Sequence, residues 1–387
     1  MEDLELLGAC ALNTIFGYEP RIAHGIADNL GSFSAVFSLP RERKDELFGP
    51  YSKYARLVGP KALDDAAAEI RRIKEIGCRF VTVADPDYPA LLRECEDAPI
   101  GLYVRGDSAD SNLFNCRPAV AIVGTRDCSF YGKEWCEKIV CTLACAPTPP
   151  LIVSGLAFGV DISAHMAALG CNLPTVAVMP GGLDDVYPRR HSAAAARIAS
   201  TPGCALVTDY PLGTSPVAFT FLRRNRIIAG MSSSTILVES KIRGGGLITA
   251  GFAFDYGRDV FVLPGRIDDP RSAGCNKLLK EKTAEPITGL EELAAQLGLG
   301  VVNRRRREDL AALVSRTFSA DLPPAKVDEL VRITKLIKAF RGISLEELCR
   351  KTELGYSEVS SDVGLLENEG IVDLDLLQRC TIHVKNA

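Results

Sequence analysis

Residues 73–290 alternate short apolar runs with helical stretches, and this alternation constrains the fold more than any other feature of the sequence. Apolar strands separated by helices are typical of an open, doubly wound, mostly parallel α/β sheet. The predicted strands are 80–84, 119–124, 150–154, 175–179, 205–208, 235–239 and 259–263, and helices are predicted at 132–146, 160–169, 223–229 and 247–256. Ligands of such sheets bind beyond the carboxyl ends of the strands, so the loops that follow the strands are the candidates for a functional site.

Helical segments flank the predicted sheet on both sides. Residues 1–72 are predicted to form short helices, because Leu4, Leu7 and Ala11 recur at helical spacing. Small helical modules contact nucleic acid in some proteins, but a packing role is the favoured interpretation.

The C-terminal segment has the outline of a winged helix. Residues 326–387 are predicted to form helices 327–340, 344–352 and 356–368, followed by strands 370–375 and 380–384. Ser344 and Glu347 have the spacing of a capping box. The segment 291–325, which includes the basic run 303–308, is the predicted linker. The predicted domains are therefore 1–72, 73–290 and 326–387, in agreement with the two to three domains expected for 387 residues.

The overall charge neither requires nor excludes a nucleic-acid site. The chain has 45 Lys and Arg against 49 Asp and Glu, a net charge of −4, so such a site would need a local concentration of basic residues. That concentration lies between Phe219 and Gly246, where there are five basic residues and one acidic residue. The basic residues are Arg223, Arg224, Arg226, Lys241 and Arg243.

The neighbours of these basic residues favour single-stranded nucleic acid. Cationic side chains follow a phosphate backbone while bases stack on rings such as Phe221. The glycines at 244–246 would let backbone amides approach phosphate at the start of a helix. The alternative is that some of the arginines form ion pairs in the core or in a dimer, and Arg226, which precedes an apolar run, is the one most suited to that role.

Two other strand-to-helix loops carry polar groups. Gly124 and Arg126 follow one strand and could bind a phosphate, although a tight turn with a surface arginine explains them equally well. Asp161 and His165 are spaced i, i+4 and could form an acid/base pair, but a capping or orienting hydrogen bond is favoured. We therefore assign no catalytic residue.

The cysteines and histidines indicate a reduced, metal-free chain. No CxxC pair occurs among the 13 cysteines, and six of them lie in or beside apolar runs, which is typical of reduced, core-packed thiols. These six are Cys10, Cys136, Cys141, Cys145, Cys171 and Cys204. The histidines lack ligand spacing, so no metal site is expected. No signal peptide and no membrane-spanning run is recognised, so we expect a cytoplasmic protein with no membrane contact.

Nine motifs occur in an order that identifies a known family. They are Asp85-Pro-Asp-Tyr-Pro89, Tyr103-Val-Arg-Gly106, Gly124-Thr-Arg126, Ser154-Gly-Leu-Ala157, Gly182-Leu-Asp184, Arg224-Asn-Arg-Ile-Ile-Ala-Gly230, Leu247-Ile-Thr-Ala250, Val260-Phe-Val-Leu-Pro-Gly265 and Ser272-Ala-Gly-Cys-Asn276. In these motifs the chain closely resembles the DNA-processing protein A (DprA/Smf) family. The resemblance implies an extended Rossmann-like domain, with an N-terminal SAM-like module and a C-terminal winged helix.

The resemblance also implies a function and a set of site residues. Members of that family bind single-stranded DNA, protect incoming DNA during natural transformation, load the RecA recombinase onto it and form homodimers through the Rossmann-like domain. They are binding proteins and not enzymes, and no cofactor is implied. The expected DNA-binding residues are Gly124, Thr125, Arg126, Ser129, Gly155, Phe221, Arg223, Arg224, Asn225, Arg226, Lys241, Arg243, Gly244, Gly245 and Gly246.

Two other classes of function remain open at this point. The sheet also resembles that of nucleoside-monophosphate phosphoribohydrolases, whose Pro-Gly-Gly motif is echoed by Pro180-Gly181-Gly182, although the Gly-Thr and catalytic Glu that follow it in those enzymes are absent here. The third possibility is an interaction protein that works through its C-terminal module, because the predicted helix 356–368 contains acidic residues and no Lys or Arg.

Overall fold

The computed structural model describes residues 4–106, 112–302, 310–340, 342–375 and 377–382. The chain divides into two compact units, Met1–Val301 and Val302–Ala387, and each is described by itself. Within the described residues, no helix combines the length and the hydropathy that a membrane span requires.

A nine-stranded sheet forms the centre of the first unit. Its strands are β1 (Cys78–Thr82), β2 (Gly101–Gly106), β3 (Ala119–Val123), β4 (Leu151–Ser154), β5 (Thr175–Val178), β6 (Ala205–Thr208), β7 (Ser234–Leu237), β8 (Asp259–Val262) and β9 (Glu285–Pro286). Their order is β1-β2-β6-β5-β4-β3-β7-β8-β9. All seven predicted strands are present, and the pairs from β6 to β9 are parallel, which confirms the mostly parallel α/β fold.

Two strands of this nine-stranded sheet were not predicted. β9 is a two-residue edge strand, and β2 pairs antiparallel with both β1 and β6. Residues of β2 such as Leu102 and Tyr103 are fully buried, so its sequence is that of a core strand. It escapes the pattern because an antiparallel connection needs no crossover helix, so no regular strand–helix alternation marks it.

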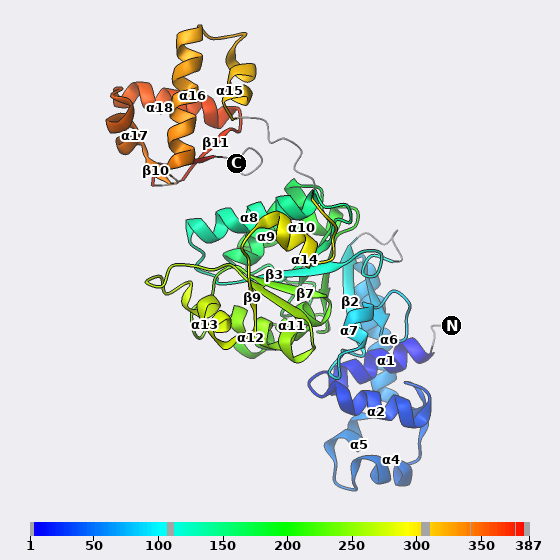
Figure 1. Cartoon of the computed structure of the whole chain (residues 1–387). Coiled ribbons are helices and arrows are strands. Elements are labelled where there is room, and N and C mark those ends of the chain that lie inside the picture. Colours follow the sequence, from blue (N-terminus) through cyan, green and yellow to red (C-terminus); the bar gives the residue numbers. More distant parts are fainter. Residues whose placement is uncertain (1–3, 107–111, 303–309, 341, 376, 383–387) are drawn as a thin grey trace. The chain divides into compact units, whose positions relative to one another are not determined.

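Helices cover both faces of this sheet, as expected of a doubly wound fold. They are α7 (Ala90–Arg93), α8 (Phe130–Ala144), α9 (Val160–Gly170), η1 (Arg189–His191), α10 (Ser192–Ser200), α11 (Ala218–Gly230), α12 (Gly245–Asp255), α13 (Ala273–Glu281) and α14 (Leu290–Gln296). Figure 1 shows α8, α9, α10 and α14 on one side of the sheet and α11, α12 and α13 on the other. α11 begins before the predicted start at residue 223, because the Thr220 hydroxyl accepts a hydrogen bond from the Val217 amide at 3.0 Å and adds a first turn.

The N-terminal helices pack against the β1–β2 side of the sheet. They are α1 (Leu4–Phe16), α2 (Pro20–Leu30), α3 (Ala35–Ser38), α4 (Arg41–Phe48), α5 (Lys53–Leu57) and α6 (Pro60–Glu75). Phe16 of α1 and Ile70 of α6 share one hydrophobic cluster with Tyr103 of β2, so the helices and the sheet have a common core. This packing is the role that the sequence favoured, while a domain boundary at residue 72 stays a prediction.

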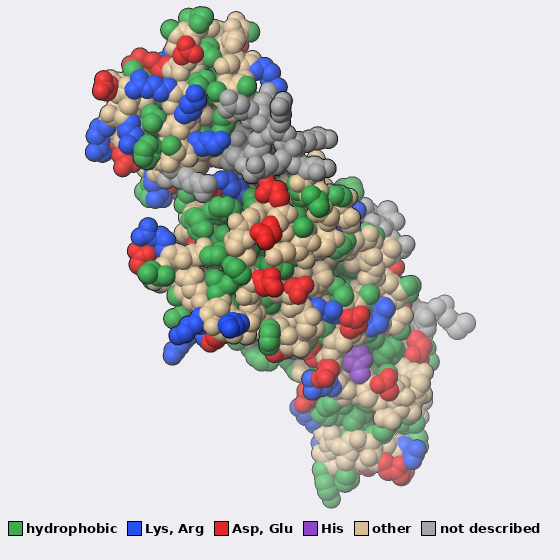
Figure 2. Space-filling model, in the orientation of Figure 1, with side chains coloured by type: hydrophobic (Ala, Val, Ile, Leu, Met, Phe, Trp, Pro, Cys, Tyr) green, Lys and Arg blue, Asp and Glu red, His purple; other side chains and the backbone are tan. Residues whose placement is uncertain are grey.

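The second unit contains the three helices and the two strands predicted within residues 326–387, together with a helix and a short strand that were not predicted. It consists of α15 (Leu310–Phe318), α16 (Pro324–Ala339), β10 (Ile343–Ser344), α17 (Leu345–Thr352), α18 (Tyr356–Asn368), β11 (Val372–Leu374) and β12 (Arg379–Ile382), with strand order β10-β12-β11. The predicted capping box is present, since the Ser344 hydroxyl accepts from the Glu347 amide at 3.2 Å and Glu347 accepts from the Ser344 amide at 3.1 Å. Figure 2 shows Lys and Arg side chains beside Asp and Glu on the face of this unit in view.

The predicted linker contains regular structure. α14 and α15 both lie within or overlap residues 291–325. The basic run 303–308 and residues 383–384 of the last predicted strand lie outside the described residues.

The cysteines are all free thiols, and the prediction of core packing needs one correction. Cys10, Cys136 and Cys204 are buried as expected, and Cys141 and Cys171 are partly buried. Cys145 is exposed, and it is the residue that caps the C-terminal end of α8.

Candidate functional site

A pocket of about 820 Å³ opens where the strand order reverses. The chain runs from β3 through β4, β5 and β6 on one side and then returns to place β7 on the other side of β3. Residues that follow β3 and β7 line the pocket, together with the loop before α9 and the start of α11. The expectation that a site lies beyond the carboxyl ends of the strands, here called the strand-end rule, therefore agrees with the position of this cavity.

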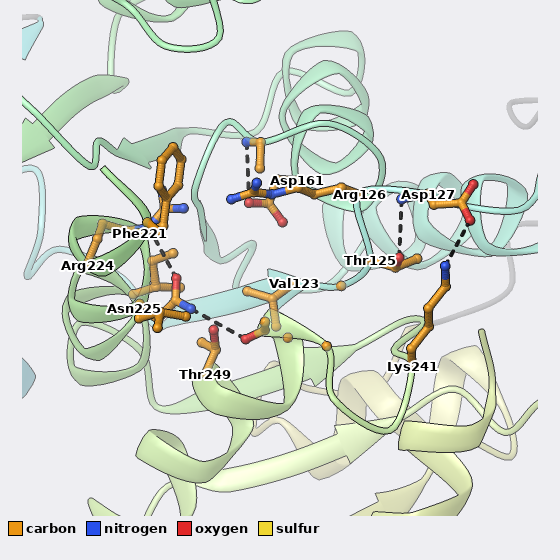
Figure 3. A pocket seen from close by; sticks show the side chains of 18 of the residues that line it. Val123, Thr125, Arg126, Asp127, Asp161, Phe221, Arg224, Asn225, Lys241 and Thr249 are labelled. Carbon is orange, nitrogen blue, oxygen red and sulfur yellow. Dashed lines mark hydrogen bonds and ion pairs between the residues drawn. The ribbon is translucent and has the colours of Figure 1, made fainter. Parts of the chain in front are cut away.

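Most of the predicted site residues line this pocket. They are Gly124, Thr125, Arg126, Phe221, Arg224, Asn225, Lys241, Arg243, Gly244, Gly245 and Gly246. Residues that are about 120 positions apart in sequence thus lie together, and Figure 3 shows Thr125 and Lys241 on one side of the pocket and Asn225 on the other.

Two glycines let the first turn of α12 lie directly against the end of β3. A Cβ atom on Gly246 would stand 2.6 Å from Leu237 Cδ1 and 3.2 Å from the Cα atom of Gly124. Any side chain at position 246 would push the helix away from the strand. The positive end of α12 consequently reaches the pocket, where backbone amides favour an anion.

Three cationic side chains of the pocket are exposed. The Arg126 guanidinium lies 4.6 Å from the centroid of the Phe221 ring, which is a cation–π contact. Lys241 Nζ lies 3.3 Å from Asp127 Oδ2, and both side chains are more than half exposed. Arg243 is also exposed. Lys241 and Arg271 lower the pKa of Asp127, so this carboxylate is charged at neutral pH and offsets part of the positive charge.

Arg224 has a buried, structural position at the back of the pocket. Its Nη1 donates to the Gly155 carbonyl at 2.6 Å and to the Val178 carbonyl. A Cβ on Gly155 would stand 2.3 Å from that nitrogen, so only glycine admits the guanidinium here. Burial lowers the pKa of Arg224 to about 10, which leaves it cationic at neutral pH.

Asp161 and His165 do not form an acid/base pair. The Asp161 carboxylate accepts from the Ala157 amide at 3.4 Å, while His165 Nδ1 lies 2.8 Å from the Thr175 hydroxyl. Burial raises the pKa of Asp161, although the nearby Arg224 opposes this shift. The orienting role that the sequence favoured is the one observed.

Four predicted residues do not line the pocket. Arg226 is buried, and its Nη2 donates to Asp209 Oδ2 at 2.7 Å. It therefore forms an ion pair in the core, which was the alternative to DNA binding that the sequence analysis gave for this residue. Arg223 Nη2 lies 3.6 Å from the same carboxylate, which directs its side chain towards the N-terminal helices. Ser129 caps α8 by accepting from the Gly132 amide at 3.0 Å, and Gly155 gives space to Arg224.

The sequence missed the apolar rim of the pocket. The apolar lining residues that were not predicted are Val123, Ala157, Tyr187, Pro216, Val217, Ala218, Leu222 and Ile228. The polar residues Asp127 and Thr249 were not predicted either, and Asp161 was considered only as a possible partner of His165. Tyr187 packs edge-to-face on Phe221 with ring centroids 5.3 Å apart. The Tyr187-Pro188 pair was the one available signal for this rim, because apolar residues such as Val217 and Leu222 cannot be told from core residues by sequence.

The chain matches known proteins in this region. The family model "DNA recombination-mediator protein A" matches residues 79–298. Protein Smf of Escherichia coli is 41% identical over 214 residues, which is 55% of this chain and 55% of that protein, so the match spans about half of each. DNA processing protein DprA of Streptococcus pneumoniae is 40% identical over 55% of this chain and 72% of its own length.

Solved structures of two DNA processing A proteins are among those similar to this chain. The structure of DNA processing protein A from Streptococcus pneumoniae has a TM-score of 0.60 and 30% identity and covers 76% of this chain and 95% of its own. The structure of DNA processing protein A from Helicobacter pylori has a TM-score of 0.50 and 30% identity, covering 56% of this chain and 95% of its own, and it concerns the single-stranded DNA binding mode of that protein.

Proposed function

Because the chain belongs to the DNA recombination-mediator protein A family, we propose that it binds single-stranded DNA in the pocket at the ends of β3 and β7. The observation that carries this proposal is the Arg126–Phe221 pair, with Lys241 and Arg243 around the same pocket. Cations track a phosphate backbone while an aromatic ring stacks with a base, whatever its identity. The DNA contacts would therefore be largely independent of base sequence.

The family resemblance supports two finer proposals. The chain would protect incoming single-stranded DNA during natural transformation and hand it to the RecA recombinase. It would act as a homodimer through the sheet-containing unit. Both are tested directly, the first by RecA filament formation on DNA already coated with this protein and the second by light scattering of the free protein.

A nucleotide-hydrolysing function has less support. Among the described residues that line the pocket, none belongs to the Pro180-Gly181-Gly182 loop. That loop is instead hydrogen-bonded to the loop at residues 213–214. The Gly182 amide donates to the Thr214 carbonyl at 3.0 Å, and Asp184 accepts from the Gly213 amide at 2.9 Å. Release of free base from AMP by the purified protein would restore this alternative.

The exposed cations provide the test of DNA binding. Arg126→Ala should weaken binding of an oligothymidylate about ten-fold, because it removes a phosphate contact and the charge above Phe221. The slope of log affinity against log salt should fall by about 0.7, the value for one phosphate contact to a single strand. Affinities are measured by fluorescence anisotropy over a salt series, with Lys241→Ala and Arg243→Ala as further variants.

The matched control is Arg266→Ala. The Arg266 side chain is 80% exposed and pairs with Asp268, outside the pocket lining. Its loss should leave both affinity and salt slope unchanged. Equal behaviour of the Arg126→Ala and control variants would refute the assignment of the pocket. Arg223, Arg224 and Arg226 are unsuitable for this test, because replacing these arginines also removes contacts that hold the fold.

A further inference from the structure

Tyr18 and Phe219 form an exposed aromatic pair outside the pocket. Their ring centroids are 5.7 Å apart with 39° between the planes, and the residues are 61% and 56% exposed. Tyr18 lies between α1 and α2, whereas Phe219 lies in the first turn of α11. Two large rings from distant parts of the chain thus meet at the surface, and no other part of the described chain covers them. Adjacent exposed apolar groups of this kind are typical of an interaction site.

Arg223 holds Tyr18, one member of this pair, in place. Its guanidinium lies 4.9 Å from the Tyr18 ring centroid and 5.9 Å from that of Tyr210, and it donates to the Gly17 carbonyl. The Arg223 side chain is only 9% exposed and lies 3.6 Å from the buried carboxylate of Asp209. Tyr18 is therefore held by an ordered cation while most of its surface stays exposed, so binding a planar group would cost little ordering of this ring.

The pair is continuous with the pocket. Leu222 lines the pocket and lies three residues after Phe219 on α11, which places both on one face of the helix. Leu222 is 44% exposed, and Val217, another lining residue, is 56% exposed. An exposed apolar surface therefore leads from Phe221 inside the pocket over the start of α11 to Tyr18.

We propose that Tyr18 and Phe219 are a second stacking platform, which binds the bases of a DNA strand where it leaves the pocket. This inference rests on the proposed function of the pocket. The occupant is single-stranded DNA because two tilted rings present separate π-faces, which suit successive bases, and because their surface continues that of the Arg126–Phe221 site. The N-terminal helices thereby contribute a DNA contact of their own.

The test compares a short and a long oligothymidylate, of about 6 and about 20 nucleotides, since site sizes for single strands cover this range. Tyr18→Ala and Phe219→Ala should each weaken binding of the long strand about 5- to 100-fold and leave the short strand, which fills the pocket alone, unchanged. Tyr18→Phe should bind both strands like the wild type, because it keeps the ring. Phe219→Leu should behave like Phe219→Ala, because it keeps apolar area without a π-face.

Tyr51→Ala is the matched control, because Tyr51 is an aromatic residue that is 93% exposed and does not line the pocket. A second measurement uses the unaltered protein: ultraviolet crosslinking of a long strand with iodouracil near one end should attach peptides that contain Tyr18 or Phe219. Long-strand affinity that is unchanged in both alanine variants, an equal loss for both strand lengths, or no crosslink to these peptides would overturn the inference.

The outcomes separate this inference from the proposed function. If Arg126→Ala weakens both strands while Tyr18→Ala and Phe219→Ala bind like the wild type, the pocket stands and the platform is wrong. If the wild type binds neither strand, both are wrong. A loss of self-association with unchanged DNA binding in Phe219→Ala would assign the pair to a protein contact instead.

Discussion

His165 is a buried histidine that is neutral in the folded protein. Its side chain is fully buried, with Nδ1 at 2.8 Å from the Thr175 hydroxyl. Burial, together with the nearby Arg224 and His191, lowers the pKa of His165 from 6.5 to about 3. The unfolded chain therefore binds a proton below pH 6.5 that the folded protein does not bind until the pH approaches 3.

This difference predicts an acid-sensitive fold. The contribution of neutral His165 is fully present above pH 6.5 and is lost as the pH falls from 6.5 towards 3. In that window it should add about 1.4 kcal/mol per pH unit to the slope of the unfolding free energy. His165→Asn, which keeps a donor for Thr175 but does not titrate, should show a shallower slope by that amount. Urea unfolding at several pH values measures it, and identical slopes for the two proteins would contradict the assignment.

At the scale of elements, α11 divides its residues between binding and structure. One face brings Phe221, Arg224 and Asn225 to the pocket, whereas Arg223 and Arg226 turn to Asp209. Asp209 follows β6, and its carbonyl accepts from the Asn13 side chain of α1 at 2.9 Å. Asp209 therefore joins α11, through its carboxylate, to the N-terminal helices, through its backbone carbonyl.

Asp209→Ala should accordingly be strongly destabilising. It leaves Arg226 without its closest carboxylate in a buried site, and breaking such a pair costs about 3–5 kcal/mol. Thermal or urea unfolding measures the loss. Asp268→Ala breaks the exposed pair with Arg266 and is the control, for which no measurable change is expected. Similar stabilities of the two variants would show that the Asp209 cluster does not hold the elements together.

At the scale of the whole molecule, the two units have separate cores. Val314, Leu330, Ile337 and Leu366 belong to one cluster of the second unit, and the pocket lies entirely in the first. A chain that ends at residue 302 should therefore unfold cooperatively and bind an oligothymidylate with the affinity of the full chain. Anisotropy and calorimetry check this. A large loss of affinity in a folded truncated chain would assign DNA contacts to the second unit and favour the hypothesis that it is the working surface.

The sequence by itself determined seven of the nine strands of the sheet and the position of the candidate pocket. Seven buried strands, the helices between them and the glycines at 124 and 244–246 are local patterns, because strand burial and close backbone approach each demand particular residue types at one position. The strand-end rule then placed the pocket correctly, since it depends on topology alone.

Only the tertiary structure decided which of the predicted residues line the pocket. Arg223, Arg224 and Arg226 are equivalent as charges in a sequence, but each residue turns about 100° around a helix, so they point to different neighbours. Their partners are Asp209, Tyr18 and the carbonyl of Gly155, which lie outside the basic segment itself. The same long-range packing brings Tyr18 to Phe219, because the place where two distant segments meet is set by the whole core and not by the residues that meet there.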